Sequence, residues 1–245
     1  MEILGVRIDN LNCQQTIAKI YEYLAGDKQC QIATVNPEFI VDSYTNHRFK
    51  DILNKCDLNT ADGFGIKLVG WFRGQNIKRC CGSDLVVKLA GEDNVNKYKI
   101  YLLGGRGAVA YAAANKLRKL NPKVNIVGTG AGFNDIKEVS LLEYNQIIDT
   151  INRHQPDILL VGYNAPYAQF FIDEWLDKMP SIKVAIAVGG SFDFIAGKIR
   201  RAPKIMRYLG LEWAWRLLLQ PSRLPRICQA IFKFLYLVIK YDRSI

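Results

Sequence analysis

The sequence predicts an α/β fold, a parallel sheet with helices on both faces, followed by a basic amphipathic helical appendage at the C-terminus. Two observations predict the sheet: short, nearly continuous apolar runs alternate with segments of helical pattern, and turn residues follow the runs. A third observation, positive charge concentrated in residues 200–245, sets the appendage apart. With 245 residues, 49% of them hydrophobic, the chain is long enough for one domain with a full core and an appendage.

Candidate strands and helices alternate along residues 1–199. The strands are predicted at 30–35, 98–103, 124–128, 157–162 and 183–188, and the helices at about 37–55, 64–72, 83–91, 107–120, 138–154 and 167–179. Such alternation is typical of right-handed βαβ units, which build a doubly wound sheet. We therefore expect residues 1–199 to form an α/β core.

Turn residues stand at the ends of four predicted strands. They are Asn36, the pair Gly104 and Gly105, Gly162, and the pair Gly189 and Gly190. Ligands of open α/β sheets bind outside the carboxyl ends of the strands, so these turns predict the rim of one binding site. Each turn alone is also explained as a tight connection without a ligand.

Two polar motifs follow predicted strands. In the run TVNPEF, Pro37 suits the first turn of a helix, so Asn36 is either a helix N-cap or, together with Thr34, a ligand contact. In the run TADGFG, Asp62 lies on a turn before an apolar helix. A carboxylate there is either an N-cap or a general base that takes a proton from an acceptor hydroxyl.

The run LLGGRGAVA contains G-x-G-x-x-A from Gly105 to Ala110, the pattern of a dinucleotide-binding turn. The acidic residue that such sites carry about 20 positions farther on is missing, so an NAD-dependent oxidoreductase is a disfavoured alternative. The turn still suits backbone N–H groups that approach a diphosphate, which makes Gly104 and Gly105 candidate substrate-binding residues.

Residues 200–245 carry ten lysines and arginines and two acidic residues, a net charge of +8, whereas the residues before them carry +2. This asymmetry indicates an anionic partner: a membrane surface, a phosphorylated ligand or a nucleic acid. Two sets of basic residues have helical spacing: Arg200, Lys204 and Arg207, and then Arg216, Arg223 and Arg226 if Pro225 does not break the helix. The planar guanidinium group suits a diphosphate.

The run 227–240 is mostly apolar. Its polar positions follow one helical stripe: Gln229, Lys233, Tyr236, Lys240 and then Arg243. A broad apolar face with a narrow basic stripe is typical of a helix that lies on a membrane, and the run is too short to span one. The alternative is a helix docked on the protein's own core. The apolar face speaks against nucleic-acid binding.

The N-terminal run MEILGVRIDN lacks a basic segment followed by an apolar one, so no signal peptide is predicted. The six cysteines show no CxxC spacing, and there are two histidines, so a metal site is poorly supported. We interpret the cysteines as reduced thiols of a cytoplasmic protein.

Six motifs in order resemble the WecG/TagA/CpsF glycosyltransferases (family 26). They are TxNPE at 34–38, ADGxG at 61–65, RxxGxDL at 79–85, LLGG at 102–105, VGGxFDxxAGKxxRAP at 188–203 and GLEWxxRL at 210–217, followed by QPxR at 220–223. The resemblance implies a Rossmann-like core and an inverting transferase. Its expected substrates are a UDP-sugar carrying N-acetylmannosamine, its uronate or a related hexose, and a polyprenyl-diphosphate-linked acceptor of cell-surface polysaccharide or teichoic acid synthesis.

The resemblance also implies residue roles and a location. Asp62 matches the candidate base, and Thr34 and Asn36 match the sugar-nucleotide pocket. Further candidate substrate contacts are Arg79, Gly104, Gly105, Gly189, Gly190, Arg216, Arg223 and Arg226, the three last in an appendage that binds the membrane and closes over the diphosphate. We expect no metal or other cofactor, because no DxD-like pair follows a strand. The expected location is the inner face of the cell membrane, and a homo-oligomer is compatible with the sequence.

One motif departs from the family's pattern. After VGxGAP the family usually has Lys-Gln-Glu, whereas this chain has Asn164 for a common glycine, Ala168 for the glutamine and Gln169 for the glutamate. That region is expected to contact the substrate, so the donor sugar stays open. A catalytically altered family member and a basic protein that binds membranes or nucleic acids are the alternative interpretations.

Overall fold

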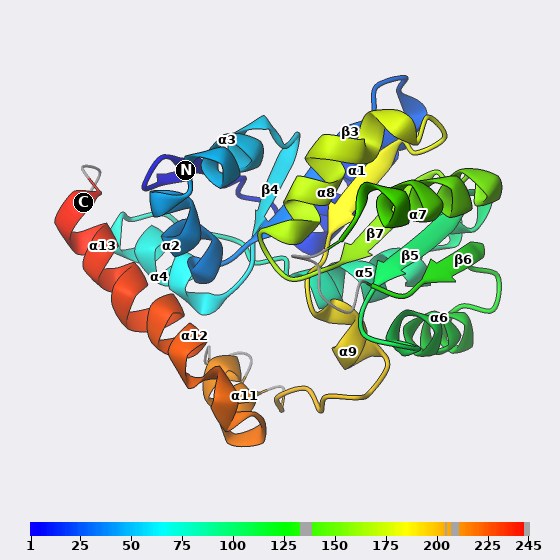
Figure 1. The fold of residues 1–245 in the computed structure, drawn as a ribbon. Helices are drawn as coiled ribbons and strands as arrows, with labels where there is room; N and C mark the ends of the chain where they lie inside the picture. The colour runs from blue at the N-terminus through cyan, green and yellow to red at the C-terminus, as the bar shows by residue number, and fades with distance from the viewer. Residues whose placement is uncertain (133–138, 204, 207–210, 243–245) are drawn as a thin grey trace.

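The computed structural model describes residues 1–132, 139–203, 205–206 and 211–242, which form an α/β fold (Figure 1). Its centre is a parallel six-stranded sheet. The strand order is β4 (Leu58–Ala61), β3 (Cys30–Val35), β8 (Val184–Ala187), β7 (Ile158–Gly162), β5 (Ile100–Gly104) and β6 (Ile126–Gly130). A small antiparallel pair, β1 (Glu2–Ile3) and β2 (Val6–Arg7), lies near the N-terminus. The predicted fold class is therefore confirmed.

Helices cover both faces of the sheet, because successive residues of its apolar strands point to opposite sides. In β7, Ile158 and Leu160 share a core cluster with residues of α1 (Cys13–Ala25), α5 (Gly82–Gly91), α6 (Val109–Leu120) and α9 (Ser191–Ile195). Leu159 and Val161 share another cluster with residues of α7 (Leu141–His154) and α8 (Tyr167–Trp175). The sheet therefore divides the core into two layers.

Strand β4 has no counterpart among the predicted strands, and polar residues explain why. Its sequence is LNTA, and both Asn59 and Thr60 are buried. Asn59 Nδ2 donates hydrogen bonds to the Leu53 carbonyl at 2.7 Å and the Arg7 carbonyl at 3.0 Å, and Thr60 Oγ1 donates to the Cys80 carbonyl at 3.0 Å. With two polar residues among its four, this buried strand shows no apolar run in the sequence.

The helix predicted at 37–55 is two helices, α2 (Pro37–Thr45) and α3 (His47–Lys55). Asn46 separates them, because its side-chain oxygen accepts the N–H of Phe49 and so begins a new helix. Helix α4 (Phe64–Phe72) has the predicted bounds. The sequence also missed α1, α9 and the short 3-10 helix η1 (Asp93–Lys97). The helix predicted at 167–179 comprises α8 and the 3-10 helix η2 (Leu176–Lys178). The first residue of the helix predicted at 138–154 lies outside the described residues.

The C-terminal segment is a chain of short helices beside α2 and α4 (Figure 1). It comprises α11 (Glu212–Leu219), η3 (Pro221–Arg223), α12 (Leu224–Cys228), the π-helical turn η4 (Gln229–Lys233) and α13 (Phe234–Tyr241). Arg216, Arg223 and Arg226 therefore do not lie on one continuous helix: Gln220 ends α11, and Pro225 stands in the first turn of α12. Arg200 lies outside any helix, and Lys204, Arg207 and Arg243 lie outside the described residues.

One face of α13 is part of the core. Phe234, Leu237 and Val238 are buried in a cluster with residues of β3, α2 and α4, so docking on the protein's own core is confirmed for this face. The exposed surface of this segment includes Phe232 of η4 and Ile239 of α13, whose exposed fractions are 70% and 75%. Among the described helices, none has the length and apolar character needed to cross a membrane.

The interpretation of all six cysteines as reduced thiols is wrong for two of them. Cys13, the first residue of α1, forms a disulfide with Cys80, which lies 67 positions farther along the chain. Cys80 is held at the end of β4, where its N–H donates to the Ala61 carbonyl. No short sequence motif marks this pair, because its two cysteines are far apart in the sequence and only the fold brings them together.

Candidate active site

A cavity of about 700 Å³ lies at the carboxyl ends of the strands, where the turns predicted a binding site. Its sheet side is lined by Thr34 near the end of β3, Asn36 after β3, Asp62 after β4, and Gly189 and Gly190 after β8. The C-terminal helices line the other side with Arg216, Arg223, Arg226 and apolar residues of η4 and α13. The cavity is therefore shared between the sheet and the appendage.

Asp62 is held in place by the main chain around it. Its N–H donates to the Val35 carbonyl at 2.7 Å, and its carboxylate accepts a hydrogen bond from the N–H of Gly82. The N-cap of α4 is Gly63, with a φ of +100° and no side-chain cap, so Asp62 does not cap this helix. Its carboxylate lines the cavity instead, as a general base must.

The pKa of Asp62 is raised to about 6, chiefly because burial disfavours the charged form. Glu212 and Asp84 raise it further, while Arg79 and the Gly82 N–H act in the opposite direction. A carboxylate with this pKa is ionised at neutral pH and is a stronger base than an exposed aspartate. The environment of Asp62 therefore suits proton abstraction.

Thr34 and Asn36 form hydrogen bonds that stabilise the fold, and both also line the cavity. Thr34 is buried and its Oγ1 donates to the Ala187 carbonyl at 3.2 Å, which joins β3 to β8. The Asn36 side-chain oxygen accepts the N–H of Phe39 at 3.1 Å, so the N-cap interpretation is confirmed. Both residues also line the cavity, so the capping role and a contact with a ligand are compatible.

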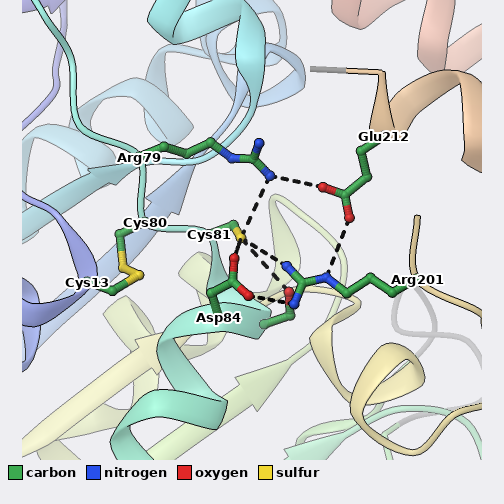
Figure 2. A network of polar contacts seen from close by, with 8 residues as sticks. Cys13, Arg79, Cys80, Cys81, Asp84, Arg201 and Glu212 are labelled. Atoms are coloured by element: carbon green, nitrogen blue, oxygen red, sulfur yellow. Dashed lines mark hydrogen bonds and ion pairs between the residues drawn. A yellow bond between two sulfur atoms is a disulfide. The ribbon is translucent and has the colours of Figure 1, made fainter. Parts of the chain in front are cut away.

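Beside Asp62, a polar network joins three motifs that are separate in the sequence (Figure 2). Arg79 Nη2 lies 2.9 Å from a carboxylate oxygen of Glu212 in α11, and Arg201 Nη1 lies 2.5 Å from an Asp84 oxygen in α5. Arg201 Nε also lies 3.7 Å from Glu212. Glu212 thus connects the C-terminal segment to the core through ion pairs with Arg79 and Arg201. Its motif and theirs therefore form one network in the fold.

Cys81 lies inside this network. Its thiol donates to Asp84 at 2.9 Å and contacts the guanidinium group of Arg201 at 3.4 Å (Figure 2). Burial and the neighbouring carboxylates of Asp62 and Asp84 raise the pKa of the thiol to about 12. The sulfur is therefore protonated at neutral pH and does not act as a thiolate nucleophile.

Three arginines from successive helical pieces converge on the cavity. The guanidinium carbon of Arg216 lies 4.7 Å from the centre of the Phe194 ring, and its buried Nε has no hydrogen-bond partner within the described structure. Arg226 binds both carboxylate oxygens of Glu38, at 3.2 and 2.8 Å. Burial, together with the charges of Arg216 and Arg226, lowers the pKa of Arg223 to about 10. Such crowded cations favour an anionic ligand.

Comparison with known proteins decides the family. The pattern described as the Glycosyl transferase WecG/TagA/CpsF family matches residues 1–244. The chain belongs to this glycosyltransferase family. A Staphylococcus aureus relative named N-acetylglucosaminyldiphosphoundecaprenol N-acetyl-beta-D-mannosaminyltransferase is 29% identical over 248 residues, which cover 100% of this chain and 94% of the relative. A Bacillus spizizenii relative of the same name is 29% identical over 223 residues, covering 91% and 83%.

Two of the glycines proposed from the family's motifs do not reach the cavity. Gly104 has a φ of +122°, and a Cβ there would lie 2.7 Å from the Gly162 carbonyl carbon, so this glycine permits close packing of β5 against β7. Gly105 packs against Val109 in the same way. Arg106, the next residue, lines the cavity instead.

The segment that departs from the family's pattern touches the cavity at one end. Asn164 and Ala165 line it, whereas Ala168 and Gln169 are buried in α8 and lie outside the lining. The replacement at Asn164 is therefore the one placed to affect a bound sugar. Glu38, Arg201 and Glu212 were missed as functional candidates, although all three stand within motifs that carried the family resemblance.

Proposed function

We propose that this glycosyltransferase moves a hexose with inversion from a UDP-sugar to a polyprenyl-diphosphate-linked acceptor. N-acetylmannosamine, its uronate or a related hexose is the proposed sugar, in the synthesis of a cell-surface polysaccharide or teichoic acid. One observation carries the proposal: a desolvated carboxylate, Asp62, and the arginines of the appendage line the same cavity in a chain of this family. The names of the curated relatives support the choice of sugar and acceptor.

The proposed chemistry is a single displacement. Asp62 takes the proton of an acceptor hydroxyl while that oxygen forms a bond to the anomeric carbon. The bond between this carbon and the diphosphate breaks at the same time, and its electron pair leaves with UDP. Arg216, Arg223 and Arg226 stabilise the charge that builds on the diphosphate. Because these cations supply the neutralising charge, we propose that the reaction needs no metal ion.

Peripheral attachment to the inner face of the cell membrane is part of the proposal. An acceptor with a long hydrocarbon chain resides in the bilayer, and the C-terminal helices expose large apolar side chains, among them Leu218, Phe232 and Ile239. Such side chains, combined with the basic charge of this segment, favour a surface rich in anionic lipids.

The experiment that tests the function is a donor screen with the full chain. UDP-N-acetylmannosamine, its uronate and other UDP-hexoses are supplied with a synthetic GlcNAc-diphosphate-polyprenyl acceptor, in the presence and absence of EDTA. We expect transfer from one of these donors at a rate that EDTA does not change. Hydrolysis or no reaction with every donor would contradict the proposed function, and loss of transfer in EDTA would contradict its metal independence.

A further inference from the structure

A second hollow, of about 520 Å³, opens beside the cavity. It shares Phe64 and Leu68 with the cavity, so the two are continuous along α4. Its remaining lining comes from α4 and the turn that follows it: Lys67, Trp71, Gly74, Gln75, Asn76 and Ile77. We call this hollow the α4 groove.

The α4 groove is built from one face of a helix. Phe64, Leu68 and Trp71 are spaced four and three residues apart, so they form one stripe along α4. The opposite face, with Ile66 and Val69, is buried in the core. Trp71 is 70% exposed, so burial in the fold does not account for this large apolar side chain. An apolar stripe that begins at a catalytic cavity and continues into the open suits an elongated apolar ligand.

We propose that the α4 groove holds the first isoprene units of the acceptor's hydrocarbon chain. This inference rests on the proposed function. The acceptor is an amphiphile whose sugar, diphosphate and hydrocarbon follow one another in a line. With the reacting hydroxyl at Asp62, the sugar and the diphosphate occupy the cavity and the first turn of α4, and the hydrocarbon follows the stripe from Leu68 toward Trp71.

Charge in the groove agrees with this direction of binding. Lys67 is exposed in the α4 groove, between Phe64 and Trp71 in the sequence. Its ammonium group offers an ion pair to the acceptor's own diphosphate, which connects the sugar to the hydrocarbon. Arg216, Arg223 and Arg226 come from the appendage and serve the donor's diphosphate, so the two anionic groups have separate partners.

A binding experiment without donor or detergent tests the groove. GlcNAc-diphosphate esters of methanol, of a two-isoprene alcohol and of farnesol are titrated into the full chain by calorimetry, below the concentrations at which they aggregate. We expect the Kd to fall as the chain lengthens. Trp71→Ala should raise the Kd of the farnesyl ester roughly tenfold, because it removes a large apolar contact, and should leave that of the methyl ester unchanged. Trp71→Phe should restore most of the affinity.

Phe72→Ala is the matched control. Phe72 is 66% exposed on the same helix, and its ring touches that of Trp71 with centroids 5.3 Å apart, but it does not line the groove. Both alanine variants lose this ring contact, and Trp71→Ala alone loses lining of the groove. Equal losses in the two variants, or a Kd independent of chain length, would overturn the proposal.

Two further outcomes distinguish acceptor binding in the groove from self-association and from failure of the proposed function. If Trp71→Ala changes the molar mass measured by light scattering but not the Kd, the groove is a contact between copies of the chain and the proposal is overturned. Failure of the proposed function would look different: the farnesyl ester would bind through Trp71, but no sugar would be transferred to it from any UDP-sugar. If Trp71→Ala transfers sugar to the farnesyl ester with the KM of the wild type, the groove proposal is rejected and the proposed function stands.

Discussion

At the scale of single residues, the environment of Asp62 raises the pKa of its carboxyl group at the expense of stability. The native pKa of about 6 exceeds the ordinary value of 3.8, so the native state binds this proton more tightly than the unfolded chain does. The contribution of the protonated Asp62 carboxyl to the free energy of unfolding is therefore full at low pH and is lost as the pH rises through about 6. At neutral pH the folded protein carries a carboxylate that it only partly solvates.

Asp62→Asn is therefore expected to be more stable than the wild type at pH 7.5. The gain is about 1–3 kcal/mol, because the amide removes the buried charge and can still accept the N–H of Gly82. The free energy of unfolding is measured in urea at pH 7.5 and near pH 5, where the gain should shrink as the wild-type carboxyl becomes protonated. A difference that is the same at both pH values would contradict this account of the pKa.

The arginines give a second prediction for individual side chains. Arg223→Ala should weaken binding of UDP about 10- to 100-fold, because it removes a charged partner of the diphosphate. Arg200→Ala is the control: Arg200 is exposed outside the cavity lining, and its carbonyl, which accepts from Trp215 Nε1, is kept. Calorimetric titration with UDP measures both. If Arg200→Ala weakened UDP binding as much as Arg223→Ala, general positive charge would explain the affinity and the cluster would not.

At the scale of elements, the C-terminal helices pack against the core with one side and expose apolar side chains on another, which the sequence pattern alone could not separate. The buried side of α13 packs in the core through Phe234, Leu237 and Val238, and Arg226 and Gln229 bind Glu38 and Asp42 of α2. Removing residues 200–245 would therefore expose core residues as well as remove the proposed membrane contact. Substitutions on the exposed side of the C-terminal helices therefore test membrane contact without exposing core residues.

The double variant Phe232→Gln and Ile239→Gln should lose at least about tenfold in affinity for anionic liposomes and keep the melting temperature of the wild type. Its control is Leu141→Gln and Leu142→Gln, which changes two exposed leucines on α7, far from α13 (Figure 1). Sedimentation with liposomes measures the affinity. Equal binding by the wild type and by the double variant of Phe232 and Ile239 would contradict membrane contact through this surface.

At the scale of the whole molecule, the sequence predicted what local patterns encode. Apolar runs indicated five of the six strands of the parallel sheet, and motifs at the strand ends led to Asp62, Thr34 and Asn36. Strand β4 was not predicted because two of its four residues, Asn59 and Thr60, are polar, and several of their hydrogen-bond partners lie far away in the sequence. The boundary between core and appendage at residues 199 and 200 stays a prediction.

Contacts between distant segments could not be predicted from spacing. The disulfide between Cys13 and Cys80 and the bonds of Glu212 to Arg79 and Arg201 each join parts of the chain that only the fold brings together. Spacing can also suggest a ligand contact that the fold does not make. Gly104 follows a strand, but its lack of a side chain permits packing against Gly162 and not the approach of a ligand. Sequence therefore indicated the motifs of the site, and the fold determines which of them meet.

The most direct test of the central claim is the rate of sugar transfer by Asp62→Asn in a single turnover. With the UDP-hexose selected by the donor screen and a GlcNAc-diphosphate-polyprenyl acceptor, we predict a loss of roughly 10²–10⁴-fold, the usual contribution of a general base. The Kd for UDP should stay within about twofold, because the arginines proposed to bind the diphosphate are untouched. Transfer at the wild-type rate would contradict the assignment of Asp62 as the base.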